Sequence, residues 1–221
     1  RAEAAALATT LRGFPLSARA ALRAGQVSVD RATVPVYERV ELTADVAATF
    51  DNPFDPDDVA LDAQIALPDG RTVAVPGFFE VPCELESTDR ERVRPAGPAR
   101  WRFRFTPTVA GKYQAVVRVR DRSGQVDCPP VSFEAVPSQH PGFVRVAPDS
   151  PRYFQCDDGK SYFPVGENVC WAGGPKPVED YSAWFRGLAG QGGNWARLWL
   201  AASEKGLEGT ASPTPKGGRG Q

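Results

Sequence analysis

Apolar and polar residues alternate along much of the chain between residues 37 and 136. In the run from Val40 to Phe50 every second residue is apolar, and the residues between them are mostly polar. Because successive side chains of a strand point to opposite faces, this pattern predicts half-buried β-strands. Comparable runs occur at four more places: Val59–Leu67, Trp101–Phe105, Tyr113–Val119 and Val131–Ala135.

Turn signals separate these runs about every ten residues, a spacing typical of antiparallel all-β domains. Pro68-Asp69-Gly70 is one of them, since proline presets φ and glycine accepts a positive φ. Tyr113 follows Gly111 at a strand entry and resembles the tyrosine corner of immunoglobulin-like sandwiches. The pattern therefore predicts an immunoglobulin-like antiparallel β-sandwich over residues 33–137, while the charged stretch from Cys83 to Pro98 is expected to be a loop.

One predicted strand has two faces of opposite character. Trp101, Phe103 and Phe105 should face the core, whereas the interleaved Arg100, Arg102 and Arg104 should face away from it. We interpret the arginine row as a solvated face or a face against the following domain. Recognition of a polyanionic glycan is the alternative.

The pattern changes between Tyr162 and Leu200. Phe163 to Val169 is a short apolar run that predicts a buried strand, and Trp195 to Leu200 predicts a second one. Between them Asp180–Ala189 has apolar residues at helical spacing, with acidic residues at its start and glycines at its end. Strand, helix and strand with short joints predict a βαβ unit with two parallel strands.

The two ends of the chain lack such patterns. Residues 1–32 are expected to be a disordered leader, and residues 138–200 to hold a linker, a small hairpin and the βαβ unit. Residues 201–221 are rich in Gly, Lys, Ser, Thr and Pro and are expected to be a disordered tail. We expect a truncation or a reading-frame slip near Ala201.

Composition excludes several classes of function. The net charge of −1 argues against a nucleic-acid binder that depends on bulk charge, and no apolar run approaches the ~20 residues of a membrane span. The single histidine, His140, lies in a linker-like segment, so a histidine-rich metal site is excluded and no cofactor is expected. The four cysteines lack C-x-x-C spacing, and disulfides such as Cys83–Cys128 and free thiols both remain open.

Two stretches carry a resemblance to known families. The run GENVCW, the helix and NWARLWL resemble the first strand, first helix and second strand of a (β/α)8 glycoside hydrolase of the cellulase-like clan. The segments NPFDP, PDG and VPGFF resemble a domain of unknown function that often precedes such barrels in secreted bacterial enzymes. The resemblance covers about residues 37 to 200 and implies a mainly β chain, in which a sandwich precedes an incomplete start of a TIM barrel.

The resemblance also implies site residues. Arg197 matches an arginine at the end of strand two that hydrogen-bonds the nucleophile, Asn168 could donate to a sugar hydroxyl, and Trp171 and Trp199 could stack on a sugar ring. The plainer interpretations are an ion pair of Arg197 with Glu167, and core packing of the tryptophans, which we expect for Trp184 and Trp195. The catalytic carboxylates of such enzymes lie on strands four and seven, so no catalytic residue is expected in this chain.

We therefore expect the N-terminal fragment of an extracellular glycoside hydrolase, itself inactive, that is secreted or periplasmic and acts on carbohydrate through the complete enzyme. The alternatives are a non-catalytic carbohydrate-binding module and a structural β-sandwich. A binding module predicts that the sandwich alone binds glycans.

Overall fold

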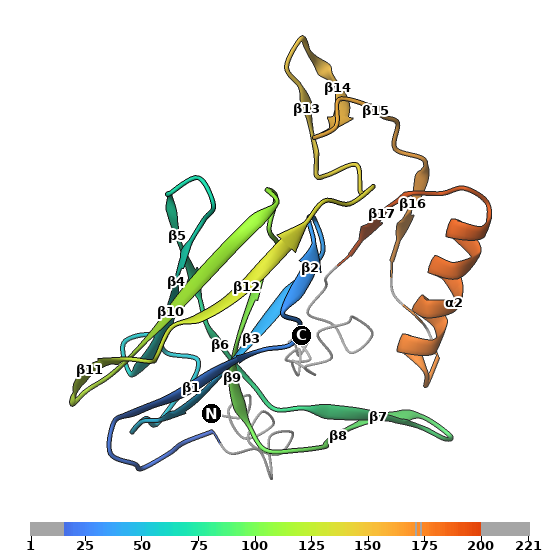
Figure 1. Ribbon diagram of the computed structural model, residues 1–221. Helices are drawn as coiled ribbons and strands as arrows, with labels where there is room; N and C mark the ends of the chain where they lie inside the picture. The colour runs from blue at the N-terminus through green and yellow to red at the C-terminus, as the bar shows by residue number, and fades with distance from the viewer. Residues whose placement is uncertain (1–15, 171, 173, 200–221) are drawn as a thin grey trace, which may run out of the picture. The chain divides into compact units, whose positions relative to one another are not determined.

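The computed structural model describes residues 16–199 except for 171 and 173. The expectations for residues 1–15, for Trp171 and for the tail at 201–221 lie outside the described residues. The described part is mainly β, with several sheets and one helix (Figure 1). It divides into two compact units: the larger contains residues 16–82 and 96–162, and the smaller contains residues 83–95 and the described residues from 163 onward.

Two sheets form the body of the larger unit (Figure 1). The first has four strands in the order β1 (Arg23–Val29), β3 (Val40–Ala47), β9 (Arg100–Phe105) and β6 (Phe78–Glu80). The second has the order β2 (Thr33–Pro35), β12 (Val131–Val136), β10 (Gly111–Asp121), β4 (Val59–Ala66) and β5 (Thr72–Pro76), with β11 (Gly124–Asp127) also paired to β10. All neighbours are antiparallel except β2 and β12.

The inner faces of the two sheets share one hydrophobic core. Leu42 and Phe103 of the first sheet and Ile65 and Val117 of the second are fully buried. The expected alternation is confirmed: β4, for example, buries Val59, Leu61, Ala63 and Ile65, and it exposes Asp62 and Gln64 between them. Trp101 is also buried at 6% exposure, as predicted.

The larger unit begins earlier than the expected boundary at residue 33. Strand β1 pairs with β3 from Arg23↔Ala47 to Val29↔Leu42, and Val27 is buried in the core. A bulge between Ala24 and Val27 interrupts the register. It also interrupts the alternation, which explains why the sequence pattern does not reveal this strand.

The stretch from Cys83 to Pro98 is also not the expected loop. It contains an antiparallel hairpin of β7 (Cys83–Ser87) and β8 (Glu91–Pro95), drawn in green in Figure 1. Oppositely charged residues face each other across it, and Arg94 pairs with Glu86 at 2.7 Å. Such cross-strand pairs support a hairpin whose sequence is too charged to suggest one.

The small hairpin that was expected after the linker is present. β13 (Val144–Ala147), β14 (Ser150–Cys156) and β15 (Ser161–Tyr162) form a three-stranded sheet. Tyr37 stacks on His140 and meets Phe143 edge-on, and Asp157 pairs with Arg145 at 2.5 Å.

The four cysteines are all free thiols. No helix among the described residues is long and apolar enough to cross a membrane.

Candidate functional site

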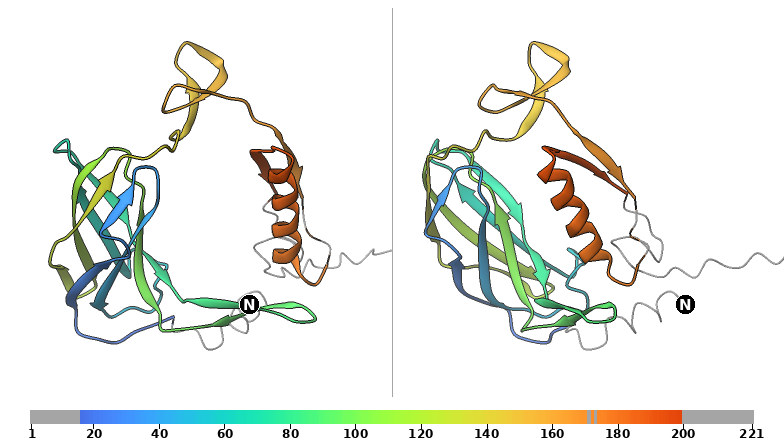
Figure 2. Two further views of the ribbon diagram at one scale, coloured as in Figure 1. Left: turned by 45° about the vertical axis from the view of Figure 1, so that its right-hand side comes forward. Right: turned by 90° about the vertical axis from the view of Figure 1, so that its right-hand side faces the viewer.

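The candidate site lies on the smaller unit, in a strand–helix–strand segment. β16 (Gly166–Val169) leads through α2 (Pro177–Gly190) to β17 (Trp195–Leu198), and the two strands are parallel. Figure 2 shows α2 lying along the strand pair. The elements occur in the expected order, but β16 starts at Gly166. Phe163 and Val165, which were expected to be buried, are 79% and 48% exposed.

Local chemistry explains where the elements begin and end. Pro177 opens α2, where a missing N–H costs nothing, and Glu179 and Asp180 lie in the first turn. At the other end Gly192 has a φ of 83°, and the amide of Gly193 donates to the carbonyl of Leu188 at 2.9 Å. Helices commonly end in this way, at a glycine with a positive φ.

The face of the strand pair toward α2 is mainly apolar, with Glu167 as its one charged residue. Val169 and Tyr181 are buried together, and Ala196 and Leu198 pack against them. The strands approach each other closely at their start, because a Cβ at position 166 would collide with the Trp195 carbonyl. Only glycine fits there.

The opposite face carries the predicted binding residues. Asn168 and Arg197 are direct register partners, so their side chains share a face, and each is the third residue of its four-residue strand. Trp199 follows two residues after Arg197, whose guanidinium carbon lies 5.8 Å from the centre of the indole ring. The structure therefore brings Asn168, Arg197 and Trp199 together, and Trp171 lies outside the described residues.

The plainer interpretation of Arg197 is not realised in the described part of the chain. Glu167 precedes Asn168 in β16 and so points to the face opposite Arg197. Among the described residues, no ion pair of Arg197 is found. Its guanidinium is exposed and can bind an anionic or hydroxyl group.

Two residues that sequence reasoning missed hold this segment together. The Tyr181 hydroxyl donates to the carbonyl of Cys170 at 2.9 Å and accepts from the amide of Ala172 at 3.2 Å. Asn194 accepts from the amide of Val165 at 2.8 Å and donates to the carbonyl of Phe163 at 3.1 Å. The sequence signal that could have pointed to Asn194 is its position directly after two glycines.

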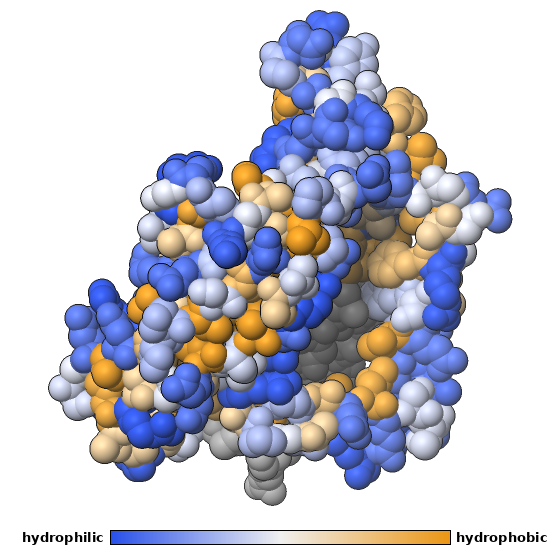
Figure 3. All heavy atoms as spheres, in the orientation of Figure 1, coloured by the Kyte–Doolittle hydropathy of each residue, from blue (hydrophilic) through white to orange (hydrophobic). Residues whose placement is uncertain are grey.

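The expected burial of Trp184 and Trp195 is wrong: they are 44% and 43% exposed. Trp184 on α2 meets the buried Tyr181 edge-on, with ring centroids 5.3 Å apart, and Trp195 shares the face of Arg197. Figure 3 shows hydrophobic residues exposed among hydrophilic ones on the surface of the molecule. Burial of these rings would need further packing partners, which a local sequence pattern cannot specify.

On the larger unit, the side chains of Arg100, Arg102 and Arg104 form ion pairs with nearby carboxylates. Arg102 and Arg104 contact Glu41 at 2.5 and 2.8 Å, and Arg100 contacts Glu80 at 2.9 Å. Burial alone would raise the pKa of Glu41, but the hydrogen bond from Arg104 and the neighbouring guanidinium charges hold that pKa below its usual value. These internal pairs weaken the interpretation of the row as a polyanion site. In the part of the chain that the structure describes, no cluster of side chains could hold a metal ion.

Comparison with known proteins supports part of the resemblance inferred from the sequence. Residues 33–120 match the family model described as a domain of unknown function, DUF5060. Most of the first sheet and part of the second lie within this range, where the resemblance to such a domain is confirmed. No curated protein matches the chain.

Among solved structures, the chain is similar to a "putative glycoside hydrolase" from Bacteroides vulgatus ATCC 8482, with a TM-score of 0.51 and 22% identity. The match covers 76% of this chain and 28% of that one. At this identity the likeness concerns the fold, and the chain spans little more than a quarter of the other protein's length. A second match, to the PmoD soluble domain from Methylocystis sp. ATCC 49242 (Rockwell), has 14% identity, a TM-score of 0.28 and coverage of 55% and 97% of the two chains.

Proposed function

We propose that this chain is the N-terminal part of an extracellular glycoside hydrolase that cleaves O-glycosidic bonds of poly- or oligosaccharides. The larger unit would be an immunoglobulin-like accessory domain, and β16, α2 and β17 would start a (β/α)8 barrel. The observation that carries the proposal is the shared face of Asn168 and Arg197 on two parallel strands, opposite the helix. Secretion or a periplasmic location is part of the same proposal.

Barrel geometry explains why that face matters. In a (β/α)8 barrel the helices lie outside, so the strand face away from the helix points into the barrel. Active sites form at the C-terminal ends of the strands. α2 covers one face of the pair, and Asn168 and Arg197 lie near the C-terminal ends on the other. In the complete enzyme both side chains would reach the mouth of the barrel.

Each residue then has a definite role. The Arg197 guanidinium would hydrogen-bond the nucleophilic carboxylate, orient it and keep it ionised, since a nearby positive charge lowers a carboxylate pKa. Asn168 would donate to a sugar hydroxyl, and Trp199 would offer its ring to a sugar face. A retaining glycosidase needs two carboxylates about 5 Å apart, which the proposal assigns to later barrel strands. The 221-residue chain by itself should be inactive.

The test is a comparison of this chain with a longer protein that completes the barrel. We expect the longer protein to hydrolyse one member of a panel of aryl-glycosides and plant polysaccharides, and the 221-residue chain to hydrolyse none. Arg197→Ala in the longer protein should lower kcat on the order of 10²-fold, as misplacement of a reacting group does. Arg186→Ala, on the exposed helix surface, is the matched control and should leave kcat unchanged.

Two outcomes decide against the proposal. Turnover by the short chain that survives repurification would require a catalytic pair among residues assigned to turns and surface. Glycan binding by the longer protein without cleavage of any substrate would favour the alternative, a non-catalytic carbohydrate-binding or structural module.

A further inference from the structure

A small apolar pocket lies where the chain crosses from β5, the last strand of the second sheet, to β6, the last strand of the first. We call it the Phe54 pocket; its volume is about 250 Å³. The lining residues come from the loop at 53–56, the start of β4, the crossing at 76–79 and Trp101, and all of them are apolar. The segments NPFDP and VPGFF, which carry part of the resemblance inferred from the sequence, therefore meet at this pocket.

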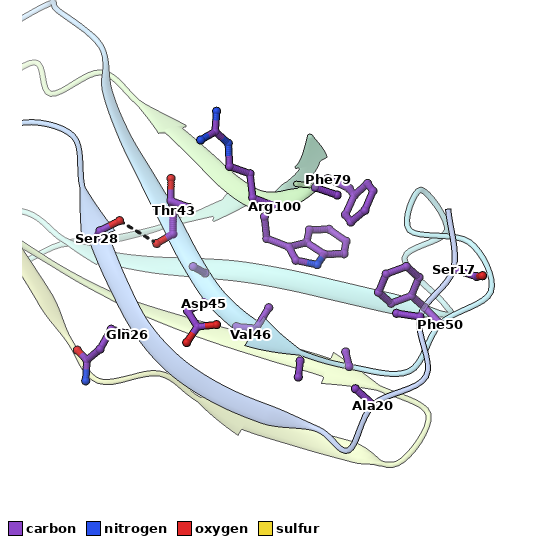
Figure 4. A pocket seen from close by; sticks show the side chains of 16 residues that line it. Ser17, Ala20, Gln26, Ser28, Thr43, Asp45, Val46, Phe50, Phe79 and Arg100 are labelled. Atoms are coloured by element: carbon purple, nitrogen blue, oxygen red, sulfur yellow. Dashed lines mark hydrogen bonds between the residues drawn. The ribbon is translucent and has the colours of Figure 1, made fainter. Parts of the chain in front are cut away.

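Phe54 is the exposed ring of this pocket. It is 63% exposed, and it meets the half-buried Phe79 edge-on with ring centroids 6.2 Å apart. Phe79 in turn contacts the core rings of Trp101 and Phe50, at centroid distances of 5.2 and 5.8 Å. Figure 4 shows Phe79 and Phe50 at the same end of a larger neighbouring pocket. The core therefore supports Phe79, while Phe54 adds an exposed apolar ring, a feature typical of interaction surfaces.

The loop that carries Phe54 is held by its own hydrogen bonds. The buried carboxylate of Asp58 accepts from the amides of Asp51 and Asn52 at 2.6 and 2.8 Å. The side chain of Asn52 accepts from the amide of Phe54 at 3.1 Å, and the carbonyl of Asp55 accepts from the amide of Asp58 at 3.0 Å. These bonds fix the position of Phe54 before anything binds, which lowers the entropic cost of binding there.

The chemistry of the lining favours an apolar side chain over a sugar. The pocket has no side chain that could bind sugar hydroxyls, which would lose their water without a replacement. Its volume also lies below the ~300–1,000 Å³ of most small-ligand pockets. An occupant with one large apolar side chain meets both conditions.

The charges beside the pocket favour a basic residue next to that side chain. Asp55 and Asp57 are exposed, and neither forms an ion pair within the described part of the chain. Arg120 donates to the carbonyl of Pro56 at 2.9 Å, so one negative charge remains in excess. An occupant with a lysine or arginine near its apolar side chain would complement this charge.

The described chain begins close to this pocket. Ala18 forms an antiparallel bridge with Phe50, with N–O distances of 2.9 and 3.0 Å. Figure 4 shows Ser17 beside Phe50. Because the two bridged stretches run in opposite directions, the residues before Ala18 head the same way as those after Phe50, toward Phe54.

The segment before residue 16 has the chemistry that the pocket needs. Residues 1–15 carry a net positive charge and one aromatic residue, Phe14. Phe14 precedes Ala18 by four residues, which span up to about 14 Å when extended. Two ring contacts, of 5.8 and 6.2 Å between centroids, lead from Phe50 to Phe54, so Phe14 is within reach of the pocket.

We propose that residues 1–15 dock at the Phe54 pocket, with the side chain of Phe14 inside it and Arg12 beside Asp55 and Asp57. The docked segment would cover the apolar surface that NPFDP and VPGFF form together. A second copy of the chain and an apolar residue of another protein are the rival occupants. The proposal concerns the larger unit and stands whether or not the complete protein is a hydrolase.

The experiment is limited trypsin digestion of the full chain, in which mass spectrometry follows cleavage after Arg12. A synthetic peptide of residues 1–15 gives the rate for the undocked segment. We expect the full chain to be cleaved at least about tenfold more slowly than the peptide, whatever the protein concentration, because a docked segment is withheld from the protease. Phe54→Ala and Phe14→Ala, each compared with its matching peptide, should restore most of the peptide rate, since both remove an anchor side chain. Phe14→Leu should keep part of the protection.

Matched controls lie elsewhere in the chain. Phe163→Ala removes a ring that is 79% exposed on the smaller unit and should leave the rate unchanged. Asp57→Asn should raise the rate, whereas Asp149→Asn, also at an exposed position, should not. Thermal unfolding of each variant shows that the fold is retained. Any of three results overturns the proposal: the full chain is cleaved as fast as the peptide, protection survives Phe54→Ala, or protection is lost on dilution, which would assign the pocket to a second copy.

Discussion

At the scale of single residues, the buried Tyr113, Asp121 and Glu41 of the larger unit each have specific partners. The Tyr113 hydroxyl donates to the carbonyl of Val109 at 2.7 Å, the contact expected of a tyrosine corner. Asp121 accepts from the amide of Thr49 and from Ser123. Glu41 is the least expected member of this group, because it is 6% exposed and lies on the sheet face away from the core.

Glu41→Gln tests the arginine–glutamate pairs of that face. The folded protein lowers the pKa of this carboxyl group, so the stabilisation is fully present above the pKa in the unfolded chain. It is lost as the pH falls through the folded value. We expect the variant to lower the free energy of unfolding by about 1–3 kcal/mol at neutral pH, as for hydrogen bonds to charged groups.

Urea unfolding at a series of pH values measures this effect. The difference between wild type and Glu41→Gln should shrink toward acidic pH. Glu134→Gln, on an exposed position of β12, is the control and should show no such trend. A difference that is independent of pH would show that the charge of Glu41 is not the stabilising feature.

At the scale of elements, helix α2 depends on a residue far away in the sequence. Lys176 occupies the N-cap position and gives no side-chain cap. Instead, the carboxylate of Glu91 on β8 accepts from the amides of Val178 and Glu179, both at 2.8 Å. An anion at this position binds unsatisfied amides and the positive end of the helix dipole. The charged hairpin therefore supplies the helix cap.

Glu91→Ala should expose these two amides and weaken the helix start by about 1 kcal/mol, as for loss of other caps. Amide hydrogen exchange at Val178 and Glu179 should become faster. Glu84→Ala, on the same hairpin and exposed, should leave both rates unchanged. Equal rates in wild type and Glu91→Ala would contradict the capping role.

At the scale of the whole molecule, the larger unit needs strand β1. Val27 belongs to its core, and Ala18 forms an isolated bridge with Phe50. A chain that starts at residue 33, where the family match begins, would leave β3 paired only with β9 and would open the core where Val27 packs.

We expect the chain without its first 32 residues to be less stable than the chain without its first 15. The difference should be at least about 3 kcal/mol, because full burial of one large aliphatic side chain contributes about 1.5–3 kcal/mol and β1 also covers neighbouring residues. Denaturant unfolding monitored by tryptophan fluorescence measures it. Val27→Ala in the longer form should reproduce part of the loss. Equal midpoints for the two deletions would show that β1 is dispensable.

The sequence by itself determined the elements whose pattern is local. The two-residue period placed β3, β4, β9, β10 and β12, and it assigned Trp101 and Phe103 to the core. The helical spacing placed α2, and the short joints predicted the parallel pair on which Asn168 and Arg197 share a face. These features follow from the geometry of one strand or one helix, which repeats along the chain.

The tertiary structure decided what depends on contacts between distant residues. No local sequence pattern specifies the β7–β8 hairpin, the Glu91 cap on α2, or the exposure of Trp184 and Trp195. Each depends on register and on which faces meet. Two residues 87 positions apart, such as Glu91 and Val178, become partners only when the chain folds, because nothing in either local stretch specifies the other.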